Sequence, residues 1–340
     1  MNVLVTGGAG FIGSNFVRRS MEGVYPGTRG AAVTVLDSLT YAGNLDNLAP
    51  VMEDPRLEFV HGDIRDVSLV RSLMDRVTTV VHFAAESHVD RSIGGAAEFI
   101  STNVVGSQVL LDAALEAEVH RFLLVSTDEV YGSADQGTWT EESPLLPNSP
   151  YSASKAAADH MARAYFQTHG LPVVTVRTSN NYGPYQHTEK LIPLFTTRLL
   201  DRRTVPLYGD GYNVREWVHV DDHCRGIALA LERGAPGRVY NIGSQDRVSN
   251  IDMAATVVGL TGADRSLVRA VSDRKGHDRR YALNSSRALT ELGHRPQIPL
   301  EQGLAETVEW YRRNRAWWSP DSAVTAPASQ HTKEKGTARA

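Results

Sequence analysis

Cysteine is nearly absent from this sequence: Cys224 is the only one among 340 residues. A single cysteine cannot form an internal disulfide, which excludes a disulfide-rich scaffold of the secreted type. Apolar runs of the ~18 residues needed to cross a bilayer are also lacking. The segment after Met1 does not resemble a secretory signal. We therefore expect a cytoplasmic protein with no membrane partner.

An excess of basic charge is lacking as well. The chain has 35 Lys and Arg against 39 Asp and Glu, which gives a formal net charge of −4. This slightly negative net charge gives no sign of the excess of positive charge that nucleic-acid-binding proteins carry. The 12 histidines form neither a Cys/His cluster nor an H-E-x-x-H motif. Only His219 and His223, beside Asp221 and Asp222, have a spacing that suggests ligands, and we expect no metal site.

What the sequence does contain is a regular alternation of short apolar runs and helical patterns in its first half. This alternation is typical of an α/β fold with a parallel, doubly wound Rossmann sheet. The expected strands are residues 3–6, 33–36, 57–60, 79–83, 121–126 and 173–177. The expected helices are residues 11–21, 67–76, 97–117 and 151–170.

The pattern becomes irregular after Thr178, where prolines and glycines interrupt the apolar runs. We expect a smaller, interleaved C-terminal substrate domain there, with one strand, 239–242, returning to the sheet. The predicted division is a Rossmann domain at 1–180 with 220–245, and a substrate domain at 181–219 and 246–318. Residues 319–340 are rich in Ser, Thr, Pro and charge, and we expect a disordered tail.

A glycine motif, G-x-x-G-x-x-G, lies between the first expected strand and the first expected helix, at Gly7, Gly10 and Gly13. The first glycine permits a tight turn, the second lets a pyrophosphate approach the backbone, and the third lets helix and strand pack closely. The helix N-terminus, with Phe11 and Ile12, then offers free N–H groups to phosphates. Because strand, loop and helix occur in this order, the motif predicts a dinucleotide site.

Acidic and small residues at the ends of the next strands extend this prediction. Asp37 ends the second strand, where a carboxylate can accept hydrogen bonds from both ribose hydroxyls and would repel the extra phosphate of NADP. NAD is therefore the expected cofactor. Asp63 and Ile64 follow the third strand and are expected to meet the adenine, although Asp63 could equally cap the next helix. Ala84 and Ala85 follow the fourth strand, where small residues allow close approach.

Tyr151 and Lys155 are one helical turn apart and share a helix face. A phenol has an unperturbed pKa of about 10, and a neighbouring ammonium is expected to lower it. Tyr151 could then remove a hydroxyl proton while the dinucleotide takes a hydride from the same carbon. Thr127, or Ser126 beside it, could hydrogen-bond the same hydroxyl. The alternative is an amphipathic helix with a buried Tyr and a surface Lys.

These motifs resemble the extended short-chain dehydrogenase/reductase family of nucleotide-sugar enzymes, in particular its dTDP-glucose 4,6-dehydratases. The resemblance rests on the motifs above and on the segments 126–132, 180–187, 189–193 and 215–219, and it covers residues 1–318. Its most specific part is Asp128 beside Glu129, because a plain dehydrogenase needs no pair of acids at the end of the fifth strand.

The resemblance implies oxidation of dTDP-glucose at C4, loss of water across C5–C6, and reduction of C6 by the same NAD. Tyr151 is expected to deprotonate the 4-hydroxyl, Glu129 to take the C5 proton, and Asp128 to protonate the departing C6 hydroxyl. Adjacent carboxyls disfavour double ionisation, so one of them holds a proton at neutral pH. The sequence leaves open which one does, and the alternative is that both only cap a loop.

The resemblance also implies that the second domain binds the nucleotide sugar. Arg215 is expected to meet the diphosphate, since its fork of donors suits phosphate oxygens. The other expected substrate contacts are Ser87, His88, Asn180, Lys190, Leu191, Tyr208, Asn250, Arg274 and His277. Each could instead be a surface or packing residue. Because members of the family are commonly homodimers joined by helices that flank the sheet, we expect a homodimer.

Four other functions share part of this pattern. A nucleotide-sugar 4-epimerase would share Tyr151 and Lys155 but has no need of Asp128 and Glu129. A UDP-glucuronate decarboxylase resembles the motif at Glu129 only, and a GDP-mannose dehydratase would favour NADP, which Asp37 opposes. A non-enzymatic NAD-binding protein would not need the acids or the Tyr/Lys pair. The pattern therefore favours the dehydratase and leaves the choice between dTDP and UDP open.

Overall fold

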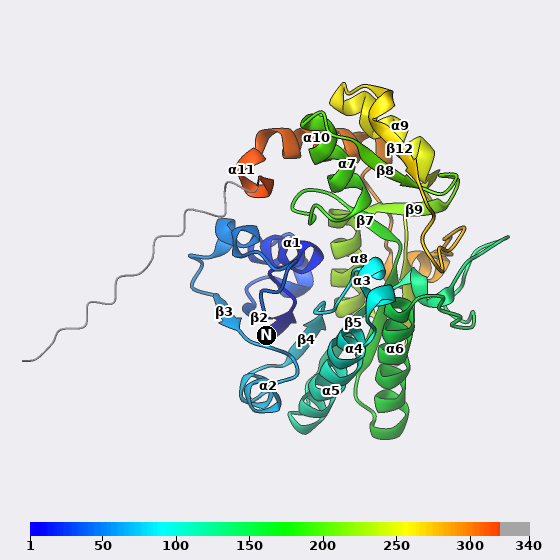
Figure 1. The fold of residues 1–340 in the computed structure, drawn as a ribbon. Coiled ribbons are helices and arrows are strands. Elements are labelled where there is room, and N and C mark those ends of the chain that lie inside the picture. Colours follow the sequence, from blue (N-terminus) through cyan, green and yellow to red (C-terminus); the bar gives the residue numbers. More distant parts are fainter. Residues whose placement is uncertain (320–340) are drawn as a thin grey trace, which may run out of the picture.

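The computed structural model describes residues 1–319, and its centre is a seven-stranded sheet (Figure 1). The strand order is β10-β6-β5-β4-β1-β2-β3, and all neighbours pair in parallel. The chain starts in the middle and winds outward in both directions, so the predicted doubly wound sheet is confirmed. The strands are β1 Asn2–Thr6, β2 Ala32–Asp37, β3 Leu57–His61, β4 Thr79–His82, β5 Arg121–Thr127, β6 Val173–Thr178 and β10 Val239–Ile242.

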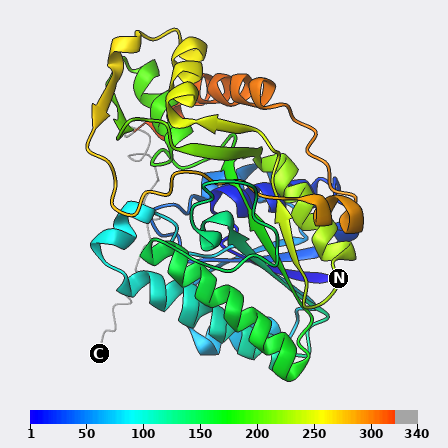
Figure 2. The same ribbon diagram turned by 90° about the vertical axis from the view of Figure 1, so that its right-hand side faces the viewer.

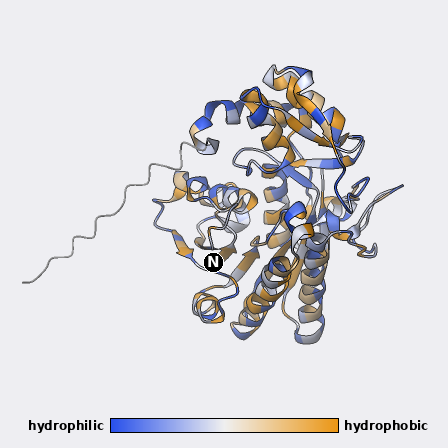
Figure 3. Cartoon of the chain, viewed as in Figure 1, coloured by the Kyte–Doolittle hydropathy of each residue, from blue (hydrophilic) through white to orange (hydrophobic). Residues whose placement is uncertain are grey.

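Alternating side chains along each strand supply both faces of the sheet with a core. On β1, Val3 and Val5 belong to a cluster with residues of α1 (Phe11–Met21) and α8 (Val220–Arg233). Leu4 belongs to the cluster on the opposite face. The helices of that face are α2 Val67–Met74, α5 Ser107–Glu116 and α6 Pro150–His169. Figure 2 shows α5 and α6 side by side on this face, and Figure 3 shows hydrophobic and hydrophilic residues alternating along both, as amphipathic packing requires.

The strand and helix boundaries agree with the prediction to within two residues, except in one helix. The single helix expected at 97–117 is wrong: α4 (Ala97–Phe99) leads into a π-helical stretch, Ile100–Gly106, before α5 begins. Within the π-helical stretch the Asn103 amide exchanges two hydrogen bonds with the Glu86 backbone, at 2.8 and 3.0 Å, and donates to Ser154 at 2.8 Å. These tertiary hydrogen bonds offset the poorer backbone geometry of the wider π-helical turn. Helix propensity does not include such contacts, so the sequence did not predict the π-helical stretch.

A smaller layer follows β6 and has its own core. Tyr182, Phe195, Trp217 and Val257 are among its buried residues. Its strands form a sheet of order β11-β9-β7 and a pair β12-β8. The elements are β7 Asn180–Tyr182, α7 Leu191–Leu200, β8 Val205–Tyr208, β9 Val214–His219, β11 Arg247–Ser249, α9 Asn250–Thr261, β12 Val268–Val271 and α10 Leu300–Arg313. In Figure 1 this layer lies above β5, and α5 and α6 lie below it.

Two further short α-helices are α3 (Val89–Gly94) and α11 (Arg315–Trp318). Among residues 1–319, no helix has the length and apolar character to cross a membrane. The disordered tail predicted for 319–340 lies, apart from Ser319, outside the described residues.

Candidate active site

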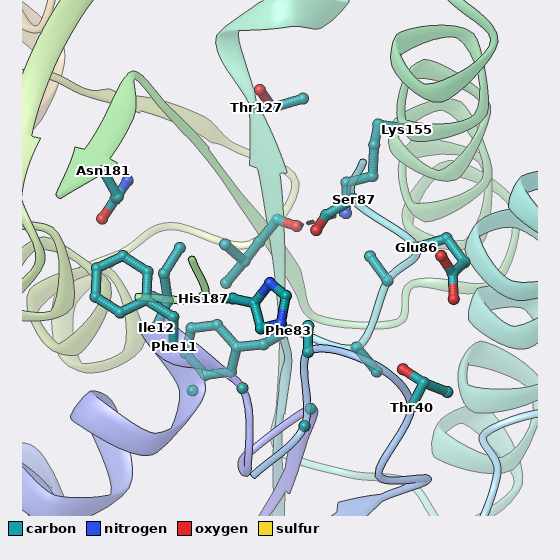
Figure 4. A pocket seen from close by; sticks show the side chains of 18 of the residues that line it. Phe11, Ile12, Thr40, Phe83, Glu86, Ser87, Thr127, Lys155, Asn181 and His187 are labelled. Atoms are coloured by element: carbon teal, nitrogen blue, oxygen red, sulfur yellow. Dashed lines mark hydrogen bonds between the residues drawn. The ribbon is translucent and has the colours of Figure 1, made fainter. Parts of the chain in front are cut away.

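A cavity of about 350 Å³ lies at the carboxyl ends of the central strands and extends to the start of α7 (Figure 4). Its lining includes every residue predicted for the cofactor and all the predicted catalytic residues. These residues are Gly7, Gly10, Phe11, Ile12, Gly13, Asp37, Asp63, Ile64, Ala84, Ala85, Thr127, Asp128, Glu129, Tyr151 and Lys155. Residues that end or follow five strands, together with Tyr151 and Lys155 of α6, therefore face one space, as expected at the switch point of a doubly wound sheet.

The glycine motif forms a tight loop with no room for side chains at two positions. Gly7 has φ +71°, and an added Cβ would lie 2.5 Å from the Ala84 nitrogen. At Gly13 an added Cβ would collide with the Gly7 carbonyl oxygen. Gly8, which the motif argument passed over, is also required, because its Cβ would lie 2.7 Å from a Val35 methyl. No side chain caps α1, so its first N–H groups are free to bind the phosphates of a dinucleotide.

Asp37 lies at the end of β2 with both carboxylate oxygens turned toward backbone amides. It accepts hydrogen bonds from the Ala9 nitrogen at 2.9 Å and the Leu39 nitrogen at 2.8 Å. Burial raises the pKa of Asp37, and these backbone hydrogen bonds oppose the rise. Each carboxylate oxygen keeps a free lone pair, so the site still fits the two ribose hydroxyls.

Asp63 also lines the cavity, but its alternative reading as a helix cap is wrong. The cap of α2 is Asp66, whose side chain accepts from the Leu69 nitrogen. Asp63 instead accepts from the backbone and guanidinium of Arg65, with a closest approach of 2.6 Å, and this pairing lowers the pKa of Asp63. The Asx-type turn thus presents Asp63 and Arg65 together at the cavity wall.

Tyr151 and Lys155 are both buried, with exposed fractions of 9% and 5%. Lys155 Nζ donates to the Val125 carbonyl oxygen at 2.8 Å, and burial lowers the pKa of Lys155 to about 8. The expected lowering of the Tyr151 pKa is wrong for this state of the protein. Burial, followed by the Glu129 carboxyl, raises the Tyr151 pKa well above its ordinary range, while a hydrogen bond to Thr127 lowers it. The phenol is therefore a neutral hydrogen-bonding group until further positive charge enters the site.

The stability of the protein should depend on pH through Lys155. The unfolded chain holds this proton up to the ordinary pKa of 10.5, whereas the folded chain releases it near pH 8. Because the unfolded state binds more protons between these values, the burial penalty is complete below pH 8 and disappears toward pH 10.5.

Relative to Lys155→Met, the unmodified protein should therefore gain about 3 kcal/mol of unfolding free energy across that window. Urea unfolding of both proteins at a series of pH values measures this difference. A difference that does not change with pH would contradict a buried ammonium.

Asp128 and Glu129 begin a 3₁₀ turn, Asp128–Tyr131, directly after β5. The cap of this turn is Thr127, whose hydroxyl oxygen accepts from the Glu129 nitrogen at 3.2 Å. The alternative in which the two acids only cap the loop is therefore wrong. Asp128 is 2% exposed and its Oδ2 has no hydrogen-bond partner. Glu129 Oε2 accepts from the Ser152 hydroxyl at 3.2 Å.

Burial raises the pKa of both acids, but the charges around them differ. Burial raises the pKa of Asp128 far above its ordinary value, and the Glu129 and Glu216 carboxyls raise it further. Burial also raises the pKa of Glu129, but the cations Arg274, Arg215 and Lys190 all lower it. Because more cations act on Glu129 than on Asp128, the arrangement favours the proton on Asp128.

The predicted substrate residues fall into two groups. Ser87, Asn180, Lys190 and Leu191 line the cavity, and Lys190 Nζ donates to the Ser87 carbonyl oxygen at 2.7 Å. The others do not line it. These are His88, Tyr208, Arg215, Asn250, Arg274 and His277.

Most of the second group lies around Asp90 at the border between the two layers. The Tyr208 hydroxyl is 3.4 Å from the Asp90 carboxylate, and Arg274 is 3.7 Å from it. The His277 ring contacts the Tyr208 ring edge-on, with centroids 6.4 Å apart. His88 caps α3 and approaches Glu189 to 3.5 Å.

Arg215 and Asn250 are buried deeper in the smaller layer. The Arg215 guanidinium donates to the Val214 and Asp278 carbonyl oxygens and lies 4.2 Å above the Tyr281 ring. Asn250 Oδ1 is buried without a hydrogen-bond partner. An unpartnered amide oxygen at the start of α9 is a polar group to which a ligand could donate.

Several cavity residues were missed by the sequence argument. Ser38, Arg65, Glu86 and Asn181 directly follow a residue that was named, so for these proximity in the chain was the available signal. They include Ser38, Thr40, Arg65, Glu86, Thr102, Asn181, His187, Glu189 and Trp217. Trp217 and Thr102 come from distant elements, and only the packing of β9 and the π-helical stretch brings them to the site.

Comparisons with known proteins agree with this geometry. The family model described as GDP-mannose 4,6 dehydratase matches residues 4–307. A dTDP-glucose 4,6-dehydratase of Streptomyces niveus is 54% identical over 331 residues, covering 96% of this chain and 98% of the relative. Another, from an Actinoplanes species, is 56% identical and covers 94% and 100%. The crystal structure of the Streptomyces venezuelae dTDP-glucose 4,6-dehydratase with NAD and TYD bound is 61% identical, with a TM-score of 0.93 and coverage of 94% and 99%.

Proposed function

The chain belongs to the GDP-mannose 4,6 dehydratase family of nucleotide-sugar enzymes, and from this we infer that it is an NAD-dependent hydro-lyase acting on dTDP-glucose. It converts dTDP-glucose to dTDP-4-keto-6-deoxyglucose and water. The observation that carries the conclusion is the pair of acids at the end of β5, buried Asp128 and half-buried Glu129, beside Tyr151.

The cavity residues fit NAD. The uncapped N-terminus of α1 and the loop at Gly7 bind the pyrophosphate, and Asp37 binds the adenosine ribose. Asp63 and Ile64 flank the adenine, while Ala84 and Ala85 leave room at the end of β4. When bound, NAD accepts the C4 hydride of the sugar and returns it to C6, so no net oxidant is consumed.

The chain's own residues handle the protons. Tyr151, with Thr127 and Lys155 beside it, would lose its own proton once the positive charge of the oxidised cofactor enters the site, and as phenolate it accepts the proton of the sugar 4-hydroxyl as C4 becomes a ketone. The ketone acidifies C5, and ionised Glu129 takes the C5 proton. Asp128 gives its proton to the C6 oxygen as the C6–O bond breaks and water leaves. Glu129 then returns a proton, exchanged with solvent, to C5 as C6 is reduced. Tyr151 releases the proton of the 4-hydroxyl to solvent, and solvent restores the proton of Asp128.

The smaller layer positions the substrate. Lys190 and Leu191, at the start of α7, and Asn180, in β7, face the sugar and phosphates together with Ser87. Arg215, Arg274 and His277 supply charge and donors for the diphosphate, and Tyr208 and Asn250 contact the thymidine. His88 supports the sugar pocket through Glu189.

The rival functions lack a use for the pair of acids. A 4-epimerase forms a ketone but eliminates no water. A decarboxylase needs no acid to protonate a leaving hydroxyl. A dehydratase that prefers NADP would bring the extra phosphate of NADP close to the Asp37 carboxylate at the end of β2, and the two negative charges would repel each other. A protein that only binds NAD would have no reason to bury the Lys155 ammonium near Tyr151, because burying that charge lowers the stability of the fold.

Incubation of the purified protein with dTDP-glucose in heavy water tests the function. A dehydratase yields a 4-keto-6-deoxy sugar with one solvent deuteron on C5 and no net NADH. A hexose product without that label would indicate an epimerase, and unchanged sugar would indicate a binding protein. Parallel incubation with UDP-glucose measures the selectivity for the base.

We also propose that the protein is a cytoplasmic homodimer. Cys224 is a free, buried thiol, which suits a reducing compartment. Large apolar side chains remain exposed on the face formed by the π-helical stretch and α3, next to α6. Ile100 is 53% exposed, Val105 46% and Ile93 37%. Such a patch beside paired helices fits an isologous interface.

Val105→Glu should dissociate this dimer. Burying an unpaired carboxylate at the interface costs several kcal/mol, which weakens association by about 100-fold or more. Light scattering coupled to gel filtration measures the mass. The control is Val24→Glu, at a side chain 49% exposed in the loop after α1. Loss of the dimer in the control alone would place the interface elsewhere.

A further inference from the structure

The last helix of the described chain, α11, closes an aromatic cluster against the Rossmann layer. The Tyr185 ring lies 4.5 Å from the Trp310 ring and 5.9 Å from the Trp317 ring, measured between centroids. On its other side the Arg18 guanidinium of α1 is 4.2 Å from the Tyr185 centroid. Figure 1 shows α11, in orange-red, close to α1. The cluster therefore joins the end of the described chain to the helix that follows the glycine loop.

A chain of hydrogen bonds runs from this helix into the cofactor site. Trp317 Nε1 donates to Asn47 Oδ1 at 3.0 Å, across 270 residues of sequence. Asn47 Nδ2 donates to the Ala9 carbonyl oxygen at 2.9 Å, and the Ala9 nitrogen donates to Asp37 Oδ2 at 2.9 Å. Asn47 is 1% exposed, so its amide has no water to replace a lost partner.

Ala9 stands in the middle of the loop between Gly7 and Gly13, which must be held in one conformation to bind a pyrophosphate. Its carbonyl is fixed by Asn47 and by the Asn44 nitrogen, and its amide by Asp37. The Asn47 amide is in turn oriented by Trp317, because an indole N–H can only donate and so forces the amide oxygen toward α11 and the NH₂ toward Ala9. The orientation of one buried amide thus depends on a residue far outside the Rossmann layer.

We propose that Trp317 is a positioning residue for the cofactor, which acts through Asn47 on the glycine loop and on Asp37. This inference rests on the proposed use of NAD. The function of the Trp317 N–H is separate from that of its ring: the ring packs on Tyr185 and Trp310, while the N–H fixes Asn47. A phenyl ring at position 317 removes the N–H but keeps an aromatic ring against Tyr185 and Trp310, so it should loosen NAD while the cluster keeps an aromatic member there.

Trp317→Phe and Trp318→Phe form a matched pair. Both remove one indole N–H from the same helix, but Trp318 Nε1 donates to the Tyr311 carbonyl oxygen at 2.7 Å, away from Asn47. The readout is the rate at which purified holoenzyme exchanges its bound NAD for isotopically labelled NAD. Loss of one hydrogen bond predicts exchange about 3- to 10-fold faster for Trp317→Phe. The KM for dTDP-glucose should be unchanged in both variants, and the exchange rate of Trp318→Phe should match the unmodified protein.

Equal exchange rates in the two variants would overturn the proposal. So would a Trp317→Phe effect that is additive with Asn47→Ala, because the two residues would then act independently. Turnover of dTDP-glucose by Trp318→Phe reports on the proposed function separately. If Trp317→Phe does not fold, hydrogen–deuterium exchange of the unmodified protein decides: NAD should slow exchange in residues 314–319 together with 43–50, and unchanged exchange in 314–319 would refute the link.

Discussion

Tyr151→Phe should abolish the first hydride transfer, so that mixing with dTDP-glucose gives no NADH absorbance. Phenylalanine keeps the buried ring but removes the only hydroxyl placed to take the 4-hydroxyl proton. Lys155 cannot replace it, because its Nζ is held by the Val125 carbonyl oxygen. Turnover should fall by about 1,000-fold or more, as expected for loss of a positioned base. Stopped-flow absorbance measures the first step and product formation measures the whole cycle.

The control for this variant lies on the same helix. Tyr165→Phe removes a phenol hydroxyl from α6 that bonds to Asp112 and does not line the cavity. It should retain the NADH signal and turnover. A normal NADH signal in Tyr151→Phe would overturn the assignment of the base, while loss of the signal in both variants would point to damage to α6.

Asp128→Asn should separate oxidation from elimination. The amide cannot give a proton to the departing C6 hydroxyl, yet Tyr151 and Lys155 are untouched. We expect NADH to accumulate after mixing with dTDP-glucose, and product formation to slow by about 100- to 1,000-fold. Absorbance of the trapped NADH and quenched-flow analysis of the sugar measure the two steps. Loss of the first hydride transfer would count against the role of Asp128.

Glu129→Gln provides the matched comparison. It should also accumulate NADH, but for a different reason, because the C5 proton can no longer be removed. In heavy water, sugar recovered from Asp128→Asn should carry deuterium at C5, since ionised Glu129 still exchanges that proton. Sugar recovered from Glu129→Gln should not. The reverse pattern would exchange the roles of the two acids.

The parallel, doubly wound sheet and the place of the cofactor could be predicted from sequence because each follows from local patterns. The consecutive apolar residues Val3, Leu4 and Val5 indicate a strand that is buried on both faces of the sheet. Gly7 and Gly13 report a loop whose backbone geometry excludes side chains. Such signals depend on neighbours in the chain, and the structure agrees with them closely.

The features that sequence did not predict depend on contacts between distant residues. The π-helical stretch follows from the contacts of Asn103 with Glu86 and Ser154. The raised pKa of Tyr151 follows from burial that only the folded protein creates. The different surroundings of Asp128 and Glu129 arise because Glu216 and Arg274 come from separate parts of the smaller layer. No local sequence pattern predicts that these charged side chains lie close to Asp128 and Glu129.

The interleaving of the chain also affects how the protein can be synthesised. The core on the α1 face of the sheet is completed by Ile227 in α8, Ile242 in β10 and Leu292 beyond them. A ribosome adding about 5 to 20 residues per second needs roughly 10 to 50 seconds to reach Ile242. Until then Val174 on β6 lacks the cover of α8 on that side. The nascent chain should therefore depend on chaperones, and its folding should complete only late in translation.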